Sequence, residues 1–178
     1  MTAYQSNETI TEAFSKSDLV GQLNQLGIKE GMVLEVHSSL KSLGYVIGGA
    51  QTVVDALIDA VGFEGTLVMP IQASSNCEPY FWENPPAERK LIKKIRDSIP
   101  AFDPDSSDIM YMGEIAANLN RRDGAYRSYH PNSAFVSYGK YGKLITNQHS
   151  LSWSLGEQSP LKVMYDLPSS VLLMGAAS

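Results

Sequence analysis

Residues 32–70 read MVLEVHSSLKSLGYVIGGAQTVVDALIDAVGFEGTLVMP, and this stretch decides the fold. The run 32–37 is short, apolar and rich in β-branched residues, which is typical of a strand. Residues 52–61 carry apolar side chains at helical spacing, and residues 66–69 form a second apolar run that Pro70 ends. Because two strands flank one helix, the stretch predicts a βαβ unit with parallel strands and a right-handed crossover.

Further elements extend this unit in both directions along the chain. Before it, leucines at helical spacing predict a short helix with Ser17 as N-cap and Gly27 as the stop signal. After it, the segment 72–108, with scattered prolines and aromatic residues, indicates a functional excursion or a lid. Within it, residues 90–99 predict a short basic helix. Regular patterns then predict helices over 112–119 and 140–146, and strands over 133–138 and 169–175, the last of them buried.

Composition limits the classes of protein to which the chain can belong. Its 178 residues fit one domain, and the single cysteine, Cys77, forms no internal disulfide, so we expect a reducing compartment. With 14 Lys and Arg against 19 Asp and Glu, the net charge of −5 argues against a nucleic-acid partner. The sequence shows neither a bilayer-spanning apolar stretch nor a signal peptide, and we expect a cytoplasmic protein with no membrane partner.

Small hydroxyl residues and glycines follow the first predicted strand. Ser38 and Ser39 end that strand, and Gly44, Gly48 and Gly49 lead into the next helix. Such a turn presents backbone N–H groups and hydroxyls without bulky side chains, which suits phosphate or amide oxygens. The spacing fits neither the phosphate-binding loop nor the dinucleotide fingerprint. The residues alone therefore leave two interpretations open, ligand binding and ordinary turn chemistry.

The histidines and serines suggest further chemistry only weakly. His37, His130 and His149 match no compact zinc motif, and one cysteine adds no ligand cluster, so we expect no metal. A hydrogen-bonded structural role is the simplest interpretation of each histidine, and His130 is the strongest candidate for another role. Ser38 and Ser39 lack the Gly-x-Ser-x-Gly elbow of serine hydrolases.

Acidic residues are dense in and just after the excursion, where aromatic residues also gather. They are Glu78, Glu83, Asp103, Asp105, Asp108 and Glu114. Carboxylates and aromatic faces would suit a cationic, polyhydroxylated ligand, and a solvated acidic loop explains the same residues equally well.

Six motifs, in the same order over about residues 19–175, resemble the antibiotic-type aminoglycoside 3-N-acetyltransferase family. They are VHSSL (36–40), GYVIGGAQTVVDAL (44–57), GTLVMP (65–70), PAFDP (100–104), MGEIA (112–116) and RSYHPNS (127–133). Each motif is weak alone, but six in register over nearly the whole chain are specific.

The resemblance implies an α/β fold, a mixed αβα sandwich with a largely parallel central sheet that is distinct from the common acetyltransferase fold. It implies transfer of an acetyl group from acetyl-coenzyme A to the 3-amino group of an aminoglycoside antibiotic, an activity of the antibiotic-resistance type. The transfer would be direct, with a general base that keeps the attacking amine neutral and no metal. The expected partners are this cofactor and a small-molecule amine.

The resemblance also assigns roles to individual residues. The cofactor set is His37, Ser38, Ser39, Leu40, Gly48, Gly49 and Ser107, the last of which stands where the family usually has a threonine. The acidic excursion is assigned to the substrate side, with Glu78, Asp103 and Glu114 as the candidates.

One part of the family pattern is absent from this sequence. The family's best base candidate lies in a His-Leu-Ala-Glu stretch shortly after a Leu-Leu-x-Gly strand, which here is 172–175 and is followed by Ala-Ala-Ser. The family base is therefore expected beyond Ser178, and we expect a single acetyltransferase-like domain over 1–178 that lacks the family's C-terminal part. His130 would then replace the base, or only order the turn that closes over the cofactor.

Two alternatives to an active transferase follow from this difference. One is a non-catalytic coenzyme A-binding module or an inactive truncated relative. The other is a metal-independent hydrolase that uses Ser38 or Ser39.

Overall fold

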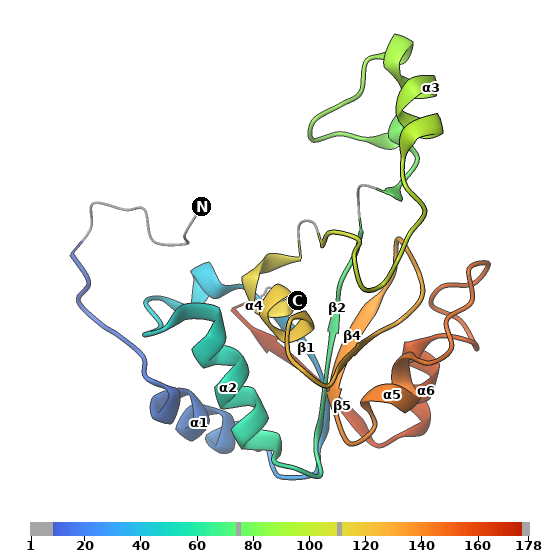
Figure 1. Cartoon of the computed structure of the whole chain (residues 1–178). Coiled ribbons are helices and arrows are strands. Elements are labelled where there is room, and N and C mark those ends of the chain that lie inside the picture. The colour runs from blue at the N-terminus through green and yellow to red at the C-terminus, as the bar shows by residue number, and fades with distance from the viewer. Residues whose placement is uncertain (1–8, 74–75, 110–111, 176–178) are drawn as a thin grey trace.

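A five-stranded mixed sheet forms the centre of the computed structural model, which describes residues 9–73, 76–109 and 112–175. The strands lie in the order β3-β4-β2-β1-β5 (Figure 1). Their bounds are β1 Val33–Ser38, β2 Thr66–Pro70, β3 Ala125–Arg127, β4 Phe135–Gly139 and β5 Ser169–Met174. The helices are α1 Lys16–Gln25, α2 Gly49–Val61, α3 Arg89–Ser98, α4 Gly113–Asn120, α5 Gly142–Thr146 and α6 Pro160–Asp166, with 3-10 turns η1 Leu40–Leu43 and η3 Pro79–Phe81.

The strand directions confirm the predicted βαβ unit. β1 pairs in parallel with β2 across the α2 crossover, and it also pairs in parallel with β5. β4 is antiparallel to both β2 and β3, so β3 runs in the same direction as β2. Four of the five described strands therefore share one direction. The two pairings of β1 are parallel and the two pairings of β4 are antiparallel, so the sheet is mixed.

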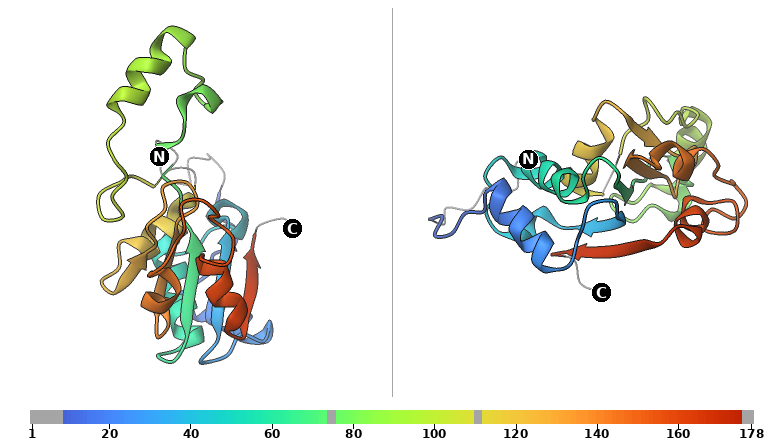
Figure 2. Two further views of the ribbon diagram at one scale, coloured as in Figure 1. Left: turned by 90° about the vertical axis from the view of Figure 1, so that its right-hand side faces the viewer. Right: turned by 90° about the horizontal axis from the view of Figure 1, so that it is seen from below.

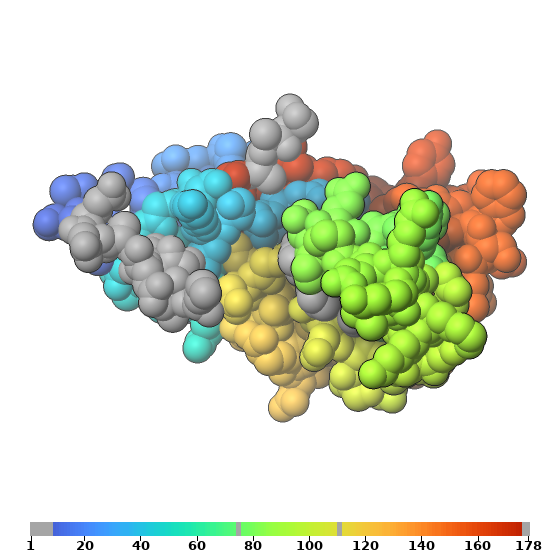
Figure 3. Space-filling view, turned by 90° about the horizontal axis from the view of Figure 1, so that it is seen from above, coloured from blue at the N-terminus to red at the C-terminus, as the bar shows by residue number. Residues whose placement is uncertain are grey.

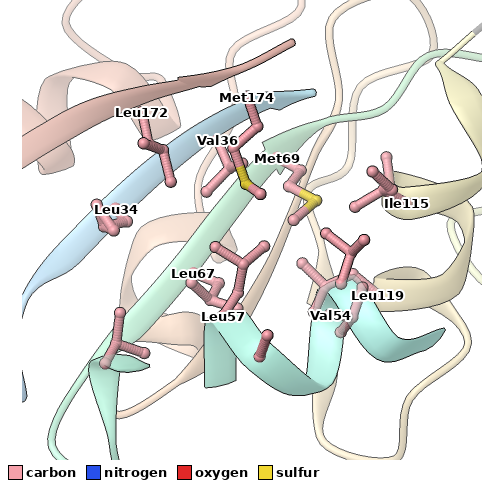
Figure 4. Close-up of a cluster of buried hydrophobic side chains, with 14 of the residues drawn as sticks. Leu34, Val36, Val54, Leu57, Leu67, Met69, Ile115, Leu119, Leu172 and Met174 are labelled. Atoms are coloured by element: carbon pink, nitrogen blue, oxygen red, sulfur yellow. The ribbon is translucent and has the colours of Figure 1, made fainter. Parts of the chain in front are cut away.

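Helices cover both faces of the sheet, because successive strand residues point to opposite sides. On one face, Leu34, Leu67 and Val136 join a core cluster with α1, α2 and α4. Figure 4 shows Leu34 and Leu67 of this cluster beside Leu57 of α2 and Leu119 of α4. On the other face, apolar side chains of β1, β2 and β4 pack against Ile145 of α5 and Met164 of α6. This is the expected αβα sandwich.

Local capping places the helix starts slightly differently from the sequence prediction. α1 begins after Ser15, not Ser17, because the Ser15 hydroxyl accepts a bond from the Asp18 N–H and the Asp18 carboxylate accepts one from the Ser15 N–H. α2 starts three residues before the predicted position, at Gly49. Its N-cap, Gly48, is left-handed with φ 83°, and a Cβ there would lie 2.4 Å from the Thr52 hydroxyl.

β5 departs from the prediction of a buried strand. Leu172 and Met174 are buried, but the exposed fractions of Val171 and Leu173 are 63% and 45%. The prediction is wrong for the face that carries Val171 and Leu173, because β5 is an edge strand. Within the described residues, the apolar cluster around Ile145 of α5 and Met164 of α6 includes no side chain of β5. An apolar run in the sequence does not say whether one or both faces of a strand are covered.

The predicted excursion stands away from the sheet. Residues 76–100, hereafter the arm, contain η3 and α3 and rise above the body of the molecule (Figure 2). α3 spans Arg89–Ser98, within one residue of the predicted helix, and no residue of it is buried. Seen from above, the arm lies nearest the viewer and covers the part of the molecule next to α4 (Figure 3).

Candidate functional site

A cavity of about 470 Å³ lies where β1 and β2 end and α4 begins. It brings together three of the sequence motifs, 36–40, 65–70 and 112–116. Its lining comprises Val36, His37, Ser38, Ser39, Leu40, Lys41, Met69, Pro70, Met112, Gly113, Glu114, Ile115 and Ala116. We call it the strand-end cavity. Ligands of α/β sheets bind in such a position, outside the carboxyl ends of parallel strands.

Residues 38–42, hereafter the serine turn, are held in place by hydrogen bonds and by close packing. The Ser39 N–H donates to the Met174 carbonyl of β5 at 2.9 Å, and the Ser42 N–H donates to the Ser39 carbonyl at 3.0 Å. The Ser39 and Ser42 hydroxyls are 2.9 Å apart. Gly175 packs against this turn with φ 64°, and a Cβ there would lie 2.8 Å from the Ser42 Cβ. The end of β5 therefore positions the turn, and this position requires glycine.

The start of α4 contributes backbone donors that the sequence interpretation missed. Met112 is the N-cap, and within the described part of the chain no side chain caps this helix end. Unpaired N–H groups and the positive end of the helix dipole favour anionic or carbonyl oxygens. Lys41 adds a positive charge to the same lining, and Glu114 adds a carboxylate. The signal available in the sequence was Gly113, which precedes an apolar helical pattern. In the structure this glycine has a φ of 79°.

His37 lines the cavity, but its imidazole is tied elsewhere. Alternation along β1 puts His37 and Glu35 on one face and Ser38 on the other. The His37 Nε2 lies 3.1 Å from the Glu35 carboxylate. The motif therefore divides, with the serine turn at the cavity and the histidine side chain paired along its own strand.

Three other predicted cofactor residues lie outside the cavity lining. Gly48 and Gly49 form the start of α2, where their conformation serves the helix start. Ser107 lies in the loop 102–107, where its hydroxyl accepts a bond from the Asp103 N–H at 2.9 Å. The structure thus gathers Ser38, Ser39 and Leu40 but not the complete predicted set.

The three predicted substrate residues occupy three different places. Glu114 lines the strand-end cavity. Glu78 belongs to the arm, where Arg96 donates two hydrogen bonds to its carboxylate at 2.6 and 2.9 Å and thereby lowers the pKa of Glu78. Asp103 lies in the loop 102–107, and the N–H of Asp105 lowers its pKa. The three carboxyls therefore do not form one cluster.

His130, the candidate base, is buried and already bonded. Its Nδ1 accepts hydrogen bonds from the N–H groups of Asn132 at 3.1 Å and Ser133 at 3.0 Å. A further bond to the Leu151 backbone raises the pKa of His130, but burial lowers it by more. The centroid of its ring lies 4.6 Å from the centroid of the His149 ring. This geometry favours the ordering role over proton transfer.

The alternative base, the one that the family resemblance implies, is expected beyond Ser178. Ser178 itself lies outside the described residues, the last of which is Gly175. The strand before it, β5, ends at Met174, whose carbonyl accepts the hydrogen bond from the serine turn. The family base would thus follow a strand whose last residue is hydrogen-bonded to Ser39 of the cavity lining, and its position stays a prediction.

His149 completes a neutral histidine pair that sequence reasoning did not predict. The Ser128 hydroxyl lies 2.9 Å from its Nδ1, and its Nε2 lies 2.6 Å from the Ser154 carbonyl. Because a carbonyl only accepts, Nε2 carries the proton and donates. Burial is the first cause of the lowered pKa of His149, and the nearby His130 lowers it further. The pair joins the 128–133 turn to the 149–154 loop.

Comparison with known proteins shows where this arrangement belongs. The sequence profile of the aminoglycoside 3-N-acetyltransferase family matches residues 36–178. The chain belongs to this family. The resemblance inferred from the six motifs is thereby confirmed.

Individual family members match over most of the chain. The aminoglycoside N(3')-acetyltransferase-like protein YokD of Bacillus subtilis (strain 168), derived from the SPbeta prophage, is 44% identical over 170 residues. That match covers 95% of this chain and 62% of YokD. The YokD crystal structure superposes with a TM-score of 0.89 over 93% of this chain and 62% of that chain, also at 44% identity.

Two solved family structures contain ligands. The binary complex of AAC-IIIb with CoASH has a TM-score of 0.79 and 26% identity, and covers 91% of this chain and 59% of that chain. AAC-VIa bound to sisomicin has a TM-score of 0.80 and 31% identity, and covers 93% of this chain and 61% of that chain. The chain therefore spans about three fifths of these relatives.

The described residues also bear on membrane insertion and metal binding. Among residues 9–73, 76–109 and 112–175, no helix is long and apolar enough to cross a membrane. Over the same ranges, no group of three or more His, Cys, Asp or Glu side chains could hold a metal ion.

Proposed function

We propose that this protein binds acetyl-coenzyme A at the strand-end cavity and transfers its acetyl group to the 3-amino group of an aminoglycoside. The observation that carries the proposal is the meeting of the Ser38–Leu40 turn with the uncapped start of α4 around one cavity. Coenzyme A offers phosphate and amide oxygens, which such N–H groups and hydroxyls bind well. Lys41 favours the negative charge of the phosphates.

The same donors suit the chemistry of acetyl transfer. The neutral amine attacks the thioester carbonyl carbon, and a new carbon–nitrogen bond forms. The carbon–sulfur bond of the thioester breaks, which yields the amide and the free coenzyme A thiol. The amine loses one proton to a base, and the leaving thiolate gains one. Backbone N–H groups near the carbonyl stabilise the negative charge that develops on its oxygen. Because the His130 Nδ1 already accepts two hydrogen bonds, we propose that His130 orders the 128–133 turn and that another group serves as the base.

The proposed cofactor residues differ in how directly the cavity supports them. Ser38, Ser39 and Leu40 line it and would contact the cofactor. Ser107 would form a separate wall, and the backbone around Gly48 and Gly49 would shape the approach. Glu114 is the proposed substrate carboxylate nearest the cofactor, because it lines the same cavity.

Family members support both ligands of the proposed reaction. AAC-IIIb has been solved with CoASH and AAC-VIa with sisomicin. We propose that residues 1–178 form one acetyltransferase-like domain that works inside the cell, where acetyl-coenzyme A is available. A chain that binds coenzyme A without transferring acetyl groups would be the binding module considered from the sequence.

Release of the coenzyme A thiol tests the proposal. The purified protein is mixed with acetyl-coenzyme A and sisomicin, and free thiol is followed with a chromogenic disulfide. Cys77 is the single cysteine, so the protein adds at most one thiol per chain to the background. We expect thiol release that depends on sisomicin, together with a product acetylated at the 3-amino group by mass spectrometry and NMR. Release without sisomicin would instead indicate thioester hydrolysis.

A further inference from the structure

Arg127 and Tyr129 contact the loop 102–107 from the segment that ends β3, and Arg127 makes most of these contacts. Tyr129 donates from its hydroxyl to the Phe102 carbonyl at 3.4 Å. Arg127, the last residue of β3, donates from Nη1 to the carbonyl oxygens of Ser107 at 2.8 Å and of Pro104 at 3.3 Å. Its guanidinium also lies over the Phe102 ring, 5.0 Å from the ring centre. One planar cation therefore contacts the beginning, middle and end of the loop.

The loop itself is a closed turn. The Ser107 N–H donates to the Asp103 carbonyl at 2.9 Å, and the Asp103 N–H donates to the Ser107 hydroxyl at 2.9 Å. The Asp105 N–H donates to the Asp103 carboxylate at 2.8 Å. Because these bonds lie within the turn, they fix its shape but not its place on the sheet. Its place depends on contacts from outside, and Arg127 supplies two hydrogen bonds of this kind.

Partial burial of the Arg127 guanidinium costs free energy of solvation. The contacts of this side chain with the loop must offset that cost. Desolvation lowers the pKa of Arg127, and the nearby Asp103 charge offsets only part of this effect. The Nε and Nη2 groups are buried and have no hydrogen-bond partner within residues 9–73, 76–109 and 112–175. An unpaired buried donor normally costs about 1–3 kcal/mol. A neutral or shorter side chain would avoid this cost but would lose the contacts with the loop.

We propose that Arg127 is a positioning residue for the cofactor, which it places indirectly by holding Ser107 and the loop 102–107 against the end of β3. This inference rests on the proposed function, because Ser107 is a cofactor residue only if coenzyme A binds. The planar guanidinium suits the task, since it bonds two carbonyls and stacks on a ring at once. A lysine ammonium is a single point of charge and cannot do both.

Arg122 provides a matched control for variants at this position. Its guanidinium is also partly buried, and it donates to the Asp55 carboxylate at 2.7 Å and to the Asn118 side chain at 2.9 Å. These contacts join the end of α4 to α2 and do not involve the loop 102–107. Replacing Arg122 removes an ion pair and several hydrogen bonds, which is at least as large a loss of contacts as at Arg127, but only the replacement of Arg127 frees the loop.

The test measures coenzyme A binding by titration calorimetry for the wild type, Arg127→Lys, Arg127→Ala and Arg122→Lys, with thermal unfolding of each. We expect Arg127→Lys to weaken binding by about tenfold or more, and Arg122→Lys to leave it within about twofold of the wild type. Methylguanidinium should restore part of the affinity of Arg127→Ala, because it can occupy the vacated site between the carbonyls. It should leave Arg122→Lys unchanged.

The outcomes separate this inference from the proposed function. If the folded wild type does not bind coenzyme A, the proposed function fails and this inference fails with it. If the wild type binds and the Arg127 variants bind equally well, only this inference is overturned. If neither Arg127 variant folds, or if methylguanidinium restores no affinity, Arg127 serves the stability of the fold, and the positioning role is also overturned.

Discussion

The body and the arm each contain an amphipathic helix, but only one of the two helices is packed. α2 in the body has six buried residues, including Val53, Val54 and Leu57, whereas no residue of α3 in the arm is buried. The exposed fraction of Leu91 in α3 is 41%, and that of Leu57 is 0%. The same sequence periodicity therefore predicts a helix in both regions without saying what covers its apolar face.

The comparison predicts its largest difference for leucine-to-alanine substitutions. Leu57→Ala should lower the free energy of unfolding by about 2–5 kcal/mol, because it leaves a cavity in the main core. Leu91→Ala should lower it by less than about 1 kcal/mol, because the side chain is already largely hydrated. Urea unfolding of both variants measures the difference. Equal losses would show that the arm contributes to the cooperative core as much as the body does.

A smaller effect is expected from the histidine pair of the body. Burial holds the pKa values of His130 and His149 below the ordinary value of 6.5. Between the folded and unfolded pKa values the unfolded chain binds more protons, so stability is full above pH 6.5 and falls as the pH drops below it. Urea unfolding at several pH values should show this fall in the wild type and a shallower one in His149→Gln. An identical pH dependence in the two proteins would contradict the assignment.

The smallest effect is expected for the ion pair of the arm. Glu78→Gln removes the bidentate contact with Arg96, whose side chain is 53% exposed. Exposed pairs contribute about 0–1 kcal/mol, so the unfolding transition of the body should hardly change. Limited proteolysis should nevertheless cut the arm faster, and added salt should reduce the difference between the variant and the wild type. A clear loss in the urea midpoint would mean that the arm and the body unfold together.

The body is also where sequence-based prediction succeeded best. The runs that became β1 and β2, with α2 between them, lie within the core and follow its periodicity closely. β3 and α6 were missed, because β3 has only three residues and α6 follows a stretch without apolar periodicity. Pro160 and the capping Ser159 were the available signals for α6.

The candidate site was predictable only where neighbours in sequence are also neighbours in space. Ser38, Ser39 and Leu40 share one turn, so their motif was sufficient. Lys41 directly follows this turn, but the start of α4 completes the cavity from a separate segment, and no local pattern connects the two. Glu78 shows the opposite case, since its acidic surroundings in the sequence do not reveal that its carboxylate pairs with Arg96 in the arm, and its substrate role stays a prediction.

Titration of coenzyme A into this protein and into its Ser38→Ala/Ser39→Ala double variant tests the central claim most directly. Both serines line the strand-end cavity, and circular dichroism verifies that both proteins are folded. We predict saturable binding by the wild type and a loss of about tenfold or more in the variant, which corresponds to at least about 1.4 kcal/mol. No binding by the folded wild type, or equal binding by the variant, would contradict the cofactor site.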